Sequence, residues 1–240
     1  MLDFGDLYEE KEDCLIVIKD LSHPCYDCRL GHFQNPKHNR GLVWRGNSNA
    51  KIAIVSIMPG PKEMEGGKPL IGGSGKLCDK WFGYIHIDTN KDAFVINVVQ
   101  CKPPDVKKSG EEKASQREPE LDEYAACFPS RCLRVLRAMP HLEVIVTLGW
   151  SAARCLLGGE PKEASHMGHW YTTSLLPDKA VYCLPHPAGL LRDEAGENKA
   201  SDAILNKKYK VIKCLDRFKR QYLDTGRAVG LASDPHNIAR

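Results

Sequence analysis

One stretch of the chain constrains its fold more than any other: an apolar run that breaks into a glycine-rich loop and then into a helical pattern. The run spans residues 52–58, the loop starts at Pro59-Gly60, and Gly72-Gly73-Ser74-Gly75 precedes the helical segment. A strand that feeds such a loop at a helix start can hold anions and small rings, because backbone N–H groups lie open there and no Cβ blocks approach. We therefore expect the chemistry at this loop.

Apolar runs that match buried parallel strands alternate with helical patterns along the chain. The runs span residues 52–58, 93–99, 144–148 and 180–184. The helical patterns span residues 75–84, 120–139, 150–157 and 207–223. This alternation predicts an α/β fold, a three-layer α/β/α sandwich around a central four-stranded parallel sheet.

The 240 residues, of which 42% are hydrophobic, are enough for one full core. We expect a single domain over residues 1–223 and a C-terminal tail over residues 224–240. Residues 14–21 form an amphipathic piece that fits a helix docked on the core. Residues 105–118 (DVKKSGEEKASQRE) are charged and lack an apolar anchor, so they are interpreted as an exposed loop.

The chain shows no sign of a membrane segment or a signal peptide. No apolar run approaches the ~18 residues of a membrane span, and the acidic start MLDFGDLYEEKED lacks the basic and apolar regions of a leader. These features favour a cytoplasmic protein. Its ten cysteines would then stay reduced, which favours a metal or cluster site over disulfides. The net charge of +3 leaves a nucleic-acid partner open.

Three segments, in this order, resemble the iron-sulfur uracil-DNA glycosylases, family 4 of that superfamily. Residues 58–72 (MPGPKEMEGGKPLIG) are similar to the first motif of the family. Residues 96–104 (INVVQCKPP) are similar to its strand with an Asn and a cluster cysteine, and residues 186–192 (HPAGLLR) to its second catalytic motif. The resemblance covers roughly residues 25–220.

The resemblance implies that four cysteines hold a [4Fe-4S] cluster: Cys25, Cys28, Cys101 and Cys127. The spacing alone suits zinc on the same thiolates equally well, and unliganded buried thiols are a further reading. The gap between the third and fourth cysteines is long for the family, so residues 105–118 are interpreted as an insertion and Cys132 is a rival ligand. The remaining cysteines are interpreted as small buried hydrophobes: Cys14, Cys78, Cys155, Cys183 and Cys214.

The resemblance also assigns catalytic roles. His186, just after a strand, would donate to the carbonyl oxygen of the departing base; the alternative is a histidine that caps a helix or fills a surface turn. Asn97 ends a buried strand, where an unpaired amide costs about 1 to 3 kcal/mol, so it needs a partner. An amide offers both donor and acceptor to the Watson-Crick edge of a pyrimidine. The alternative is a structural Asn bonded to backbone.

The first motif departs from the family, which has Gly-Glu-Ala-Pro-Gly where this chain has Ser56-Ile57-Met58-Pro59-Gly60. Ile57 thus replaces a carboxylate that positions water. Glu63 matches a second acidic position and becomes the candidate for activating water or stabilising the sugar cation. The alternative is an ordinary solvated acid.

A second departure lies at Leu70, where the family has a Phe that stacks on uracil. Losing that ring removes stacking worth roughly 1 to 3 kcal/mol and leaves more room in the pocket. We therefore hypothesise a larger or modified pyrimidine, such as a glucosylated hydroxymethylcytosine of viral DNA, and hence antiviral defence. The expected base-binding residues are Ile57, Met58, Pro59, Gly60, Leu70 and Asn97.

DNA contacts are expected on both sides of the pocket. Leu190 and Leu191 would form a wedge loop that fills the gap left by a flipped nucleotide, with Arg192 at a phosphate; the alternative is a pair of core leucines at the start of a helix. The pocket loop is flanked by Lys62, Lys68 and Lys76. The basic pattern over residues 207–220 fits a face that is merely solvated; the alternative is an extension of the DNA track.

Together these features predict a monomeric, monofunctional DNA glycosylase that flips a pyrimidine, hydrolyses its N-glycosidic bond and leaves an abasic site for base-excision repair or defence. No Lys lies at a matched catalytic position, so no lyase step is expected. The cluster is expected to be structural. The rival is an inactive iron-sulfur module that binds DNA or senses lesions; covalent capture by a nucleophilic histidine ranks lower, because the basic histidine loop of that branch is not recognisable here.

Overall fold

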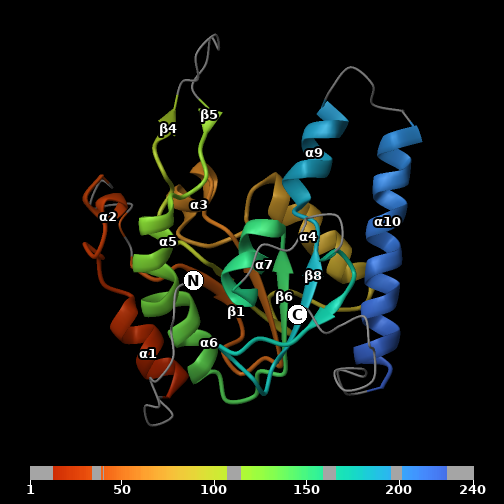
Figure 1. Cartoon of the computed structure of the whole chain (residues 1–240), viewed down its shortest axis with the longest axis horizontal. Helices are drawn as coiled ribbons and strands as arrows, with labels where there is room; N and C mark the ends of the chain where they lie inside the picture. Colours follow the sequence, from red (N-terminus) through yellow and green to blue (C-terminus); the bar gives the residue numbers. More distant parts are fainter. Residues whose placement is uncertain are drawn as a thin grey trace.

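A mixed six-stranded sheet runs through the middle of the molecule (Figure 1). The computed structural model describes residues 13–33, 39, 41–106, 115–158, 166–195 and 202–225. The strands lie in the order β1-β3-β2-β6-β8-β7. Their bounds are Trp44–Gly46 for β1, Ile52–Ser56 for β2, Ala93–Asn97 for β3, Val144–Leu148 for β6, Trp170–Tyr171 for β7 and Ala180–Leu184 for β8.

The predicted four-stranded parallel sheet is too small. The four predicted runs form the centre and pair in parallel, but β1 pairs antiparallel with β3, and β7 antiparallel with β8. The two edge strands span only three and two residues. Strands this short carry no readable apolar period, which is why the sequence did not indicate them.

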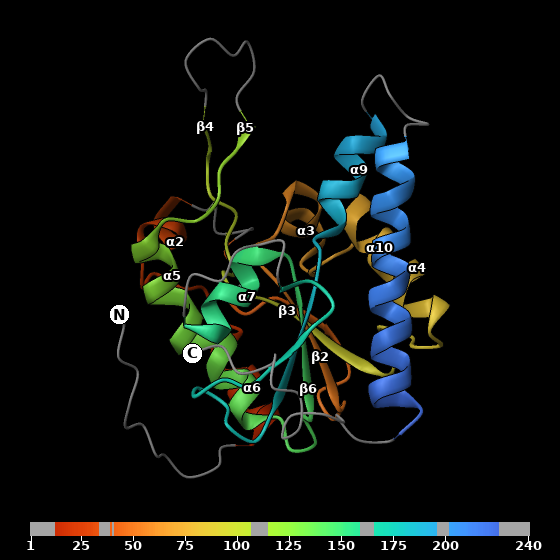
Figure 2. The same cartoon turned by 45° about the vertical axis from the view of Figure 1, so that its right-hand side comes forward.

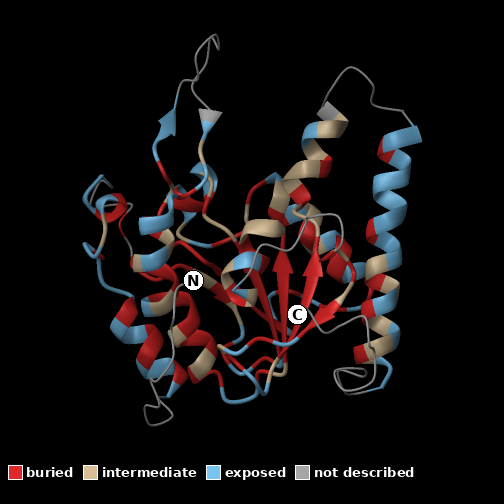
Figure 3. Cartoon of the chain, in the orientation of Figure 1, coloured by how far each residue is buried: buried red, intermediate tan, exposed pale blue. Residues whose placement is uncertain are grey.

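Helices cover both faces of the sheet and give the predicted three layers (Figures 1 and 2). One face packs against α1 (Cys14–Leu21), α6 (Arg134–Ala138) and α7 (Trp150–Leu157). The other packs against α4 (Gly73–Tyr84) and α10 (Asp202–Phe218). All residues of the four central strands are buried (Figure 3). This double burial explains why these strands read as continuous apolar runs.

The remaining helices lie around this frame: α2 (Arg29–Phe33), α3 (Pro61–Gly66), α5 (Leu121–Cys127), η1 (Phe128–Leu133), α9 (Pro187–Ala195) and η2 (Lys219–Leu223). The predicted helix over residues 120–139 is thus three consecutive pieces, α5, η1 and α6, with a π-helical stretch in the middle. Within the described ranges, none of the helices combines the length and apolar character that a membrane span requires.

The predicted exposed loop at residues 105–118 is instead a hairpin. Asp105–Val106 (β4) pairs antiparallel with Ser115–Gln116 (β5), and the hairpin projects from the same end of the molecule as α3 and α9 (Figures 1 and 2). The prediction missed it because two-residue strands leave no periodic signal. Its tip, residues 107–114, and all but the first two residues of the predicted tail lie outside the described residues.

Candidate active site

Three polar side chains meet at the carboxyl end of the sheet, where parallel strands place their functional groups. Ser56 ends β2, Asn97 ends β3, and the two residues are register partners. His186 follows the end of β8 by two residues. Its Nε2 lies 3.1 Å from the Ser56 hydroxyl. Ser56 therefore stands between Asn97 and His186 and brings the second and third motifs together.

The hydrogen bonds of His186 fix its tautomer. The backbone N–H of Ala188 donates to His186 Nδ1 at 3.1 Å, so the proton of the neutral ring resides on Nε2, which faces Ser56. Burial, and after it the nearby positive charge of Arg192, lower the pKa of His186 to about 4. At neutral pH the ring is therefore an uncharged donor.

Gly149 makes room for this histidine. It connects β6 to α7 with a φ of +83°, and a Cβ at this position would lie 2.9 Å from Cβ of His186. Its N–H also donates to the Leu184 carbonyl at 2.8 Å, which joins β6 to the end of β8. A side chain at residue 149 would both strain the backbone and displace the ring.

Asn97 is buried at 1% exposure, yet within the described part of the chain neither its amide nitrogen nor its amide oxygen has a hydrogen-bond partner. An unsatisfied buried polar atom costs about 1 to 3 kcal/mol, so such a group is kept only where it serves a purpose. A side chain with a free donor and a free acceptor side by side matches the edge of a pyrimidine base.

Glu63 braces the glycine-rich loop. Its Oε1 accepts hydrogen bonds from the backbone N–H groups of Ile71 (3.1 Å) and Gly72 (2.7 Å). Its Oε2 lies against the Pro59-Gly60 turn, 2.7 Å from where a Cβ of Gly60 would be. The carboxylate thus has one oxygen committed to the loop and one at the turn, in contrast to the solvated acid of the alternative reading.

The other predicted pocket positions line the same loop. Ile57 and Met58 are partly buried, and Pro59 is buried, with its carbonyl accepting from Gln116 of the hairpin at 3.2 Å. Leu70 is buried in the core beside α4 and has a φ of +52°. Positive φ is rare for a leucine and costs free energy, so the loop holds this residue in a strained conformation.

The predicted wedge loop is a helix. Leu190-Leu191-Arg192 lies within α9, and Leu190 is buried in the core, as the alternative reading had it. Leu191 is half-buried and lies beside Gly73 at the start of α4, so the apolar pair splits between core and surface. The prediction failed because Pro187 fits the first turn of a helix as well as a loop.

The predicted cationic side chains are exposed: Lys62, Lys68, Lys76 and Arg192. Parts of the basic face of α10 are engaged within the chain. Lys207 pairs with Asp193 at 2.6 Å, and Lys208 pairs with Glu194 at 2.7 Å. Two lysines at the start of α10 are thus paired with carboxylates of α9.

The four predicted ligand cysteines come from three segments that pack together. Cys25, Cys101 and Cys127 are buried and Cys28 is partly buried. Burial, and after it the thiols of Cys25 and Cys28, raise the pKa of Cys101 to about 12. Burial likewise raises the pKa of Cys127, with further contributions from Cys101 and Cys25.

This donor set fits a thiolate-bound group, although within the described ranges no three His, Cys, Asp or Glu side chains form a ready metal site. Three buried thiols and one partly buried thiol are unfavourable as free thiolates, and a bound cation or cluster would balance their charge. Cys132, the rival ligand, is raised in pKa by burial and then by Cys127 and Cys155, and it lies in the core of the α1 and α6 face. Cys127, in contrast, lies beside the segment of Cys101, because the N–H of Gln100 points to its Sγ.

Two buried amides that sequence reasoning missed hold the cysteine segments. Asn39 accepts from the N–H of Cys25 (2.9 Å) and donates to the Cys25 carbonyl (2.8 Å). Gln100 donates to the Asn97 carbonyl (2.5 Å), and its own N–H lies 3.4 Å from Cys127 Sγ. Gln100 therefore connects the cysteine group to the strand that carries Asn97.

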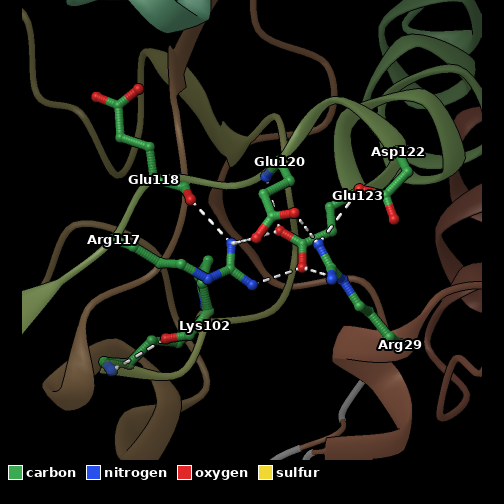
Figure 4. Close-up of polar contacts among 8 residues, drawn as sticks. Arg29, Lys102, Arg117, Glu118, Glu120, Asp122 and Glu123 are labelled. Carbon is green, nitrogen blue, oxygen red and sulfur yellow. Dashed lines mark hydrogen bonds and ion pairs between the residues drawn. The ribbon is translucent and has the colours of Figure 1, made fainter. Parts of the chain in front are cut away.

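A buried carboxylate fastens the hairpin to the same region (Figure 4). Glu123 of α5 is fully buried and accepts from Arg29, which follows the first cysteine pair (2.9 Å), and from Arg117 at the foot of the hairpin (2.7 Å). Burial raises the pKa of Glu123, but the hydrogen bonds from Arg117, the Glu120 backbone and Arg29, together with the charge of Arg117, outweigh it, so the pKa lies below its ordinary value. The sequence showed only a charged run here.

Two surface hollows lie away from these groups. One is lined by Ile85, His86 and Lys219, beyond the amino end of β2, and the other by Met64, Lys102 and Asp105 between α3 and the hairpin. Neither includes Asn97 or His186 in its lining. The candidate site thus consists of polar groups at the carboxyl end of the central strands. Its strongest marker is the Asn97 amide, which has no hydrogen-bond partner within the described residues.

Comparisons with known proteins identify the family. The family model of the uracil DNA glycosylase superfamily matches residues 43–210, which include all three motifs. The type-4 uracil-DNA glycosylase of Saccharolobus solfataricus is 30% identical over 184 residues, 75% of this chain and 78% of the relative. That of Sulfurisphaera tokodaii is 32% identical over 57% of this chain and 55% of the relative, and that of Thermotoga maritima is 26% identical over 78% and 88%. The resemblance found in the motifs is confirmed.

Proposed function

This chain belongs to the uracil DNA glycosylase superfamily, and from that membership we propose that it is a monofunctional DNA glycosylase. It flips a pyrimidine nucleotide out of the duplex, hydrolyses the N-glycosidic bond and leaves an abasic site. Relatives that carry the name type-4 uracil-DNA glycosylase support uracil as a substrate.

One observation carries the proposal: the buried amide of Asn97 has no partner within the described residues, and it lies at the same end of the sheet as a neutral histidine, with Ser56 between them. Removing a base requires recognition of its polar edge and a donor at the oxygen where negative charge develops. Asn97 supplies donor and acceptor for the base edge. His186 supplies the Nε2–H donor for the base carbonyl. The carbonyl oxygen of the base either replaces the Ser56 hydroxyl as the partner of this N–H or shares the N–H with it.

Glu63 is proposed as the acid that serves the sugar. The bond breaks with positive charge developing on the sugar, so a carboxylate near it stabilises the transition state and orients water. Its Oε1 is held by two backbone donors, which leaves Oε2 at the Gly60 turn for this role. DNA is proposed to contact Lys62, Lys68, Lys76, Leu191 and Arg192 around the pocket, which are exposed or half-buried.

The cysteine group is proposed to hold a [4Fe-4S] cluster through Cys25, Cys28, Cys101 and Cys127. When bound, the cluster supplies iron–thiolate bonds that join three chain segments. Its role is structural, because hydrolysis transfers no electrons. Gln100 and Glu123 then connect the joined segments to Asn97 and to the hairpin.

The finer proposal concerns the base. Ile57 and Leu70 replace a carboxylate and an aromatic ring of the family pattern, so the pocket is proposed to accept pyrimidines larger than uracil, such as glucosylated hydroxymethylcytosine of viral DNA. This extension rests on these two residues, whereas the names of the relatives speak for uracil. A pocket for such bases implies a role in antiviral defence, either instead of DNA repair or in addition to it.

The test is a glycosylase assay on duplex oligonucleotides that carry uracil, hydroxymethyluracil or glucosylated hydroxymethylcytosine. Abasic product from at least one substrate supports the enzyme, and product from a bulky base supports the wider pocket. Leu70→Phe should then shift the preference toward uracil. Cleavage of uracil alone, unchanged by Leu70→Phe, would refute the wider pocket and leave the glycosylase standing.

A second candidate function is an inactive module that binds DNA or abasic lesions. The observation that favours it is Ile57 at the position of the water-positioning acid, together with the loop bonds that occupy one oxygen of Glu63. Parent protein is compared with Glu63→Gln and His186→Ala in the same assay. Product that disappears in both variants supports the enzyme; binding without product in all three supports the module.

A further inference from the structure

A buried arginine contacts the loop between Cys25 and Cys28 and has no catalytic role in the proposal above. Arg131 is on η1, four residues after Cys127, and is 8% exposed. Its Nη1 donates to the Leu21 carbonyl at 3.1 Å, and its Nη2 to Asp27 Oδ2 at 3.3 Å. Asp27 is within the loop between Cys25 and Cys28, so Arg131 joins this loop to the helix of Cys127.

The guanidinium is poorly compensated by its neighbours. The Asp27 side chain is 57% exposed and makes a long contact, whereas the side chain of Arg131 is only 9% exposed. Within the described part of the chain, Arg131 Nε is buried and has no hydrogen-bond partner. A buried charge is costly unless a counter-charge lies beside it, and removing one partner of a buried pair is strongly destabilising. The position therefore calls for a further negative group.

The cysteines are the groups that supply it. Arg131 contacts Asp27, which lies between Cys25 and Cys28, and it lies four residues after Cys127 on the same helical run. Its buried guanidinium is therefore next to two of the three segments that carry the proposed ligands. Zinc or iron-sulfur ligation by four thiolates leaves the site with net negative charge.

We propose that Arg131 is the counter-charge of the bound cluster, which it stabilises and whose reduction potential it raises. The inference rests on the proposed cluster at these cysteines. Net charge and hydrogen bonds near the sulfurs are the levers that set the potential of such clusters. A positive charge beside the cluster favours the more reduced, more negative state, so removing the charge lowers the potential.

The test compares Arg131→Met, Arg131→Lys and Arg134→Met with the parent, all purified without oxygen. Arg134 is a matched control, since it lies one turn away and pairs with Asp20 at 3.4 Å on the exposed side. Two quantities are measured: the midpoint potential, by redox titration followed by electron paramagnetic resonance, and the rate at which a chelator bleaches the absorbance near ~400 nm.

Arg131→Met should have a more negative potential and bleach several times faster than the parent, Arg131→Lys should lie between them, and Arg134→Met should match the parent. If Arg131→Met holds no cluster while Arg131→Lys does, the charge is again what the site needs. Equal potentials and bleaching rates in Arg131→Met and parent overturn the proposal, as does equal cluster loss in both Arg131 variants. A colourless parent protein without iron overturns the cluster itself.

Discussion

The position of His186 is set by residues that have no side-chain chemistry of their own in the reaction. Ser56 holds Nε2, the N–H of Ala188 holds Nδ1, and Gly149 leaves the space behind the ring. Sequence reasoning identified His186 through its motif but missed its supports. A serine that ends an apolar strand and a glycine that begins a helix were the available signals, and both are common for structural reasons.

The first residue-scale prediction concerns Gly149→Ala. The new Cβ would lie 2.9 Å from Cβ of His186, and the φ of +83° disfavours alanine. We expect the free energy of unfolding to fall by about 1 to 3 kcal/mol. The single-turnover rate should fall by roughly tenfold or more, which corresponds to the loss of one transition-state contact.

Gly158→Ala is the matched control, because Gly158 also has positive φ (+65°) but nothing within 4 Å of its Cβ position. It should lose similar stability and keep its activity. Equal activity in the two variants would show that Gly149 does not position His186. Both stabilities are measured by denaturant titration.

The second residue-scale prediction concerns pH. Because burial and then Arg192 lower the pKa of His186 to about 4, the ring stays neutral and donates from Nε2 between about pH 5 and pH 8. As pH falls through the pKa, a proton adds to Nδ1, which then cannot accept from Ala188. Activity should therefore show no inflection from His186 in that range, and nitrogen NMR shifts should report one neutral tautomer. An inflection near 6.5 that His186→Asn removes would contradict this.

At the scale of elements, the insertion is a hairpin anchored at its foot. Gln116 contacts the Pro59 carbonyl, and Arg117 contacts Glu123 of α5 (Figure 4). The hairpin thus connects the pocket loop with the helix that carries Cys127. This arrangement makes Glu123 the residue on which the position of the insertion depends most.

Glu123→Gln should destabilise the protein, because it leaves Arg29 and Arg117 without their buried counter-charge. We expect loss of about 2 kcal/mol of unfolding free energy, less than for a fully buried pair since Arg29 is partly exposed. Asp122→Asn is the control: Asp122 is 67% exposed in its side chain and contacts the same Arg29. Its effect should stay within about 0.5 kcal/mol. Indistinguishable unfolding curves for the two variants would remove Glu123 from this role.

The sequence predicted elements well where burial made the pattern continuous. The runs at 144–148 and 180–184 match β6 and β8, and residues 14–21 and 150–157 match α1 and α7. It failed at β1, β7 and the hairpin, since these depend on neighbouring strands for their hydrogen bonds and are too short for a period. At the site, the motifs indicated Asn97 and His186, whereas Asn39, Gln100 and Arg131 act through contacts distant in sequence.

At the scale of the whole molecule, the proposed ligand cysteines come from segments up to about a hundred residues apart. The three motifs likewise come together at the carboxyl end of the sheet. Cys127→Ala should abolish the brown colour and the iron content. Cys132→Ala should retain both, because Cys132 lies in the core beside Cys155. Iron analysis and the absorbance near ~400 nm measure this. Loss of iron in Cys132→Ala with retention in Cys127→Ala would exchange the two assignments.

The central claim is that the amide of Asn97 is reserved for a flipped base, and Asn97→Ala tests it most directly in a single-turnover excision assay paired with thermal unfolding. Since the amide has no hydrogen-bond partner within the described residues, its removal should leave stability unchanged or raise it by about 1 kcal/mol. Excision should fall by about a hundredfold or more, as the base edge loses its donor and acceptor. An Asn97→Ala protein that excises at the parent rate, or that loses activity only because it unfolds, would contradict the account.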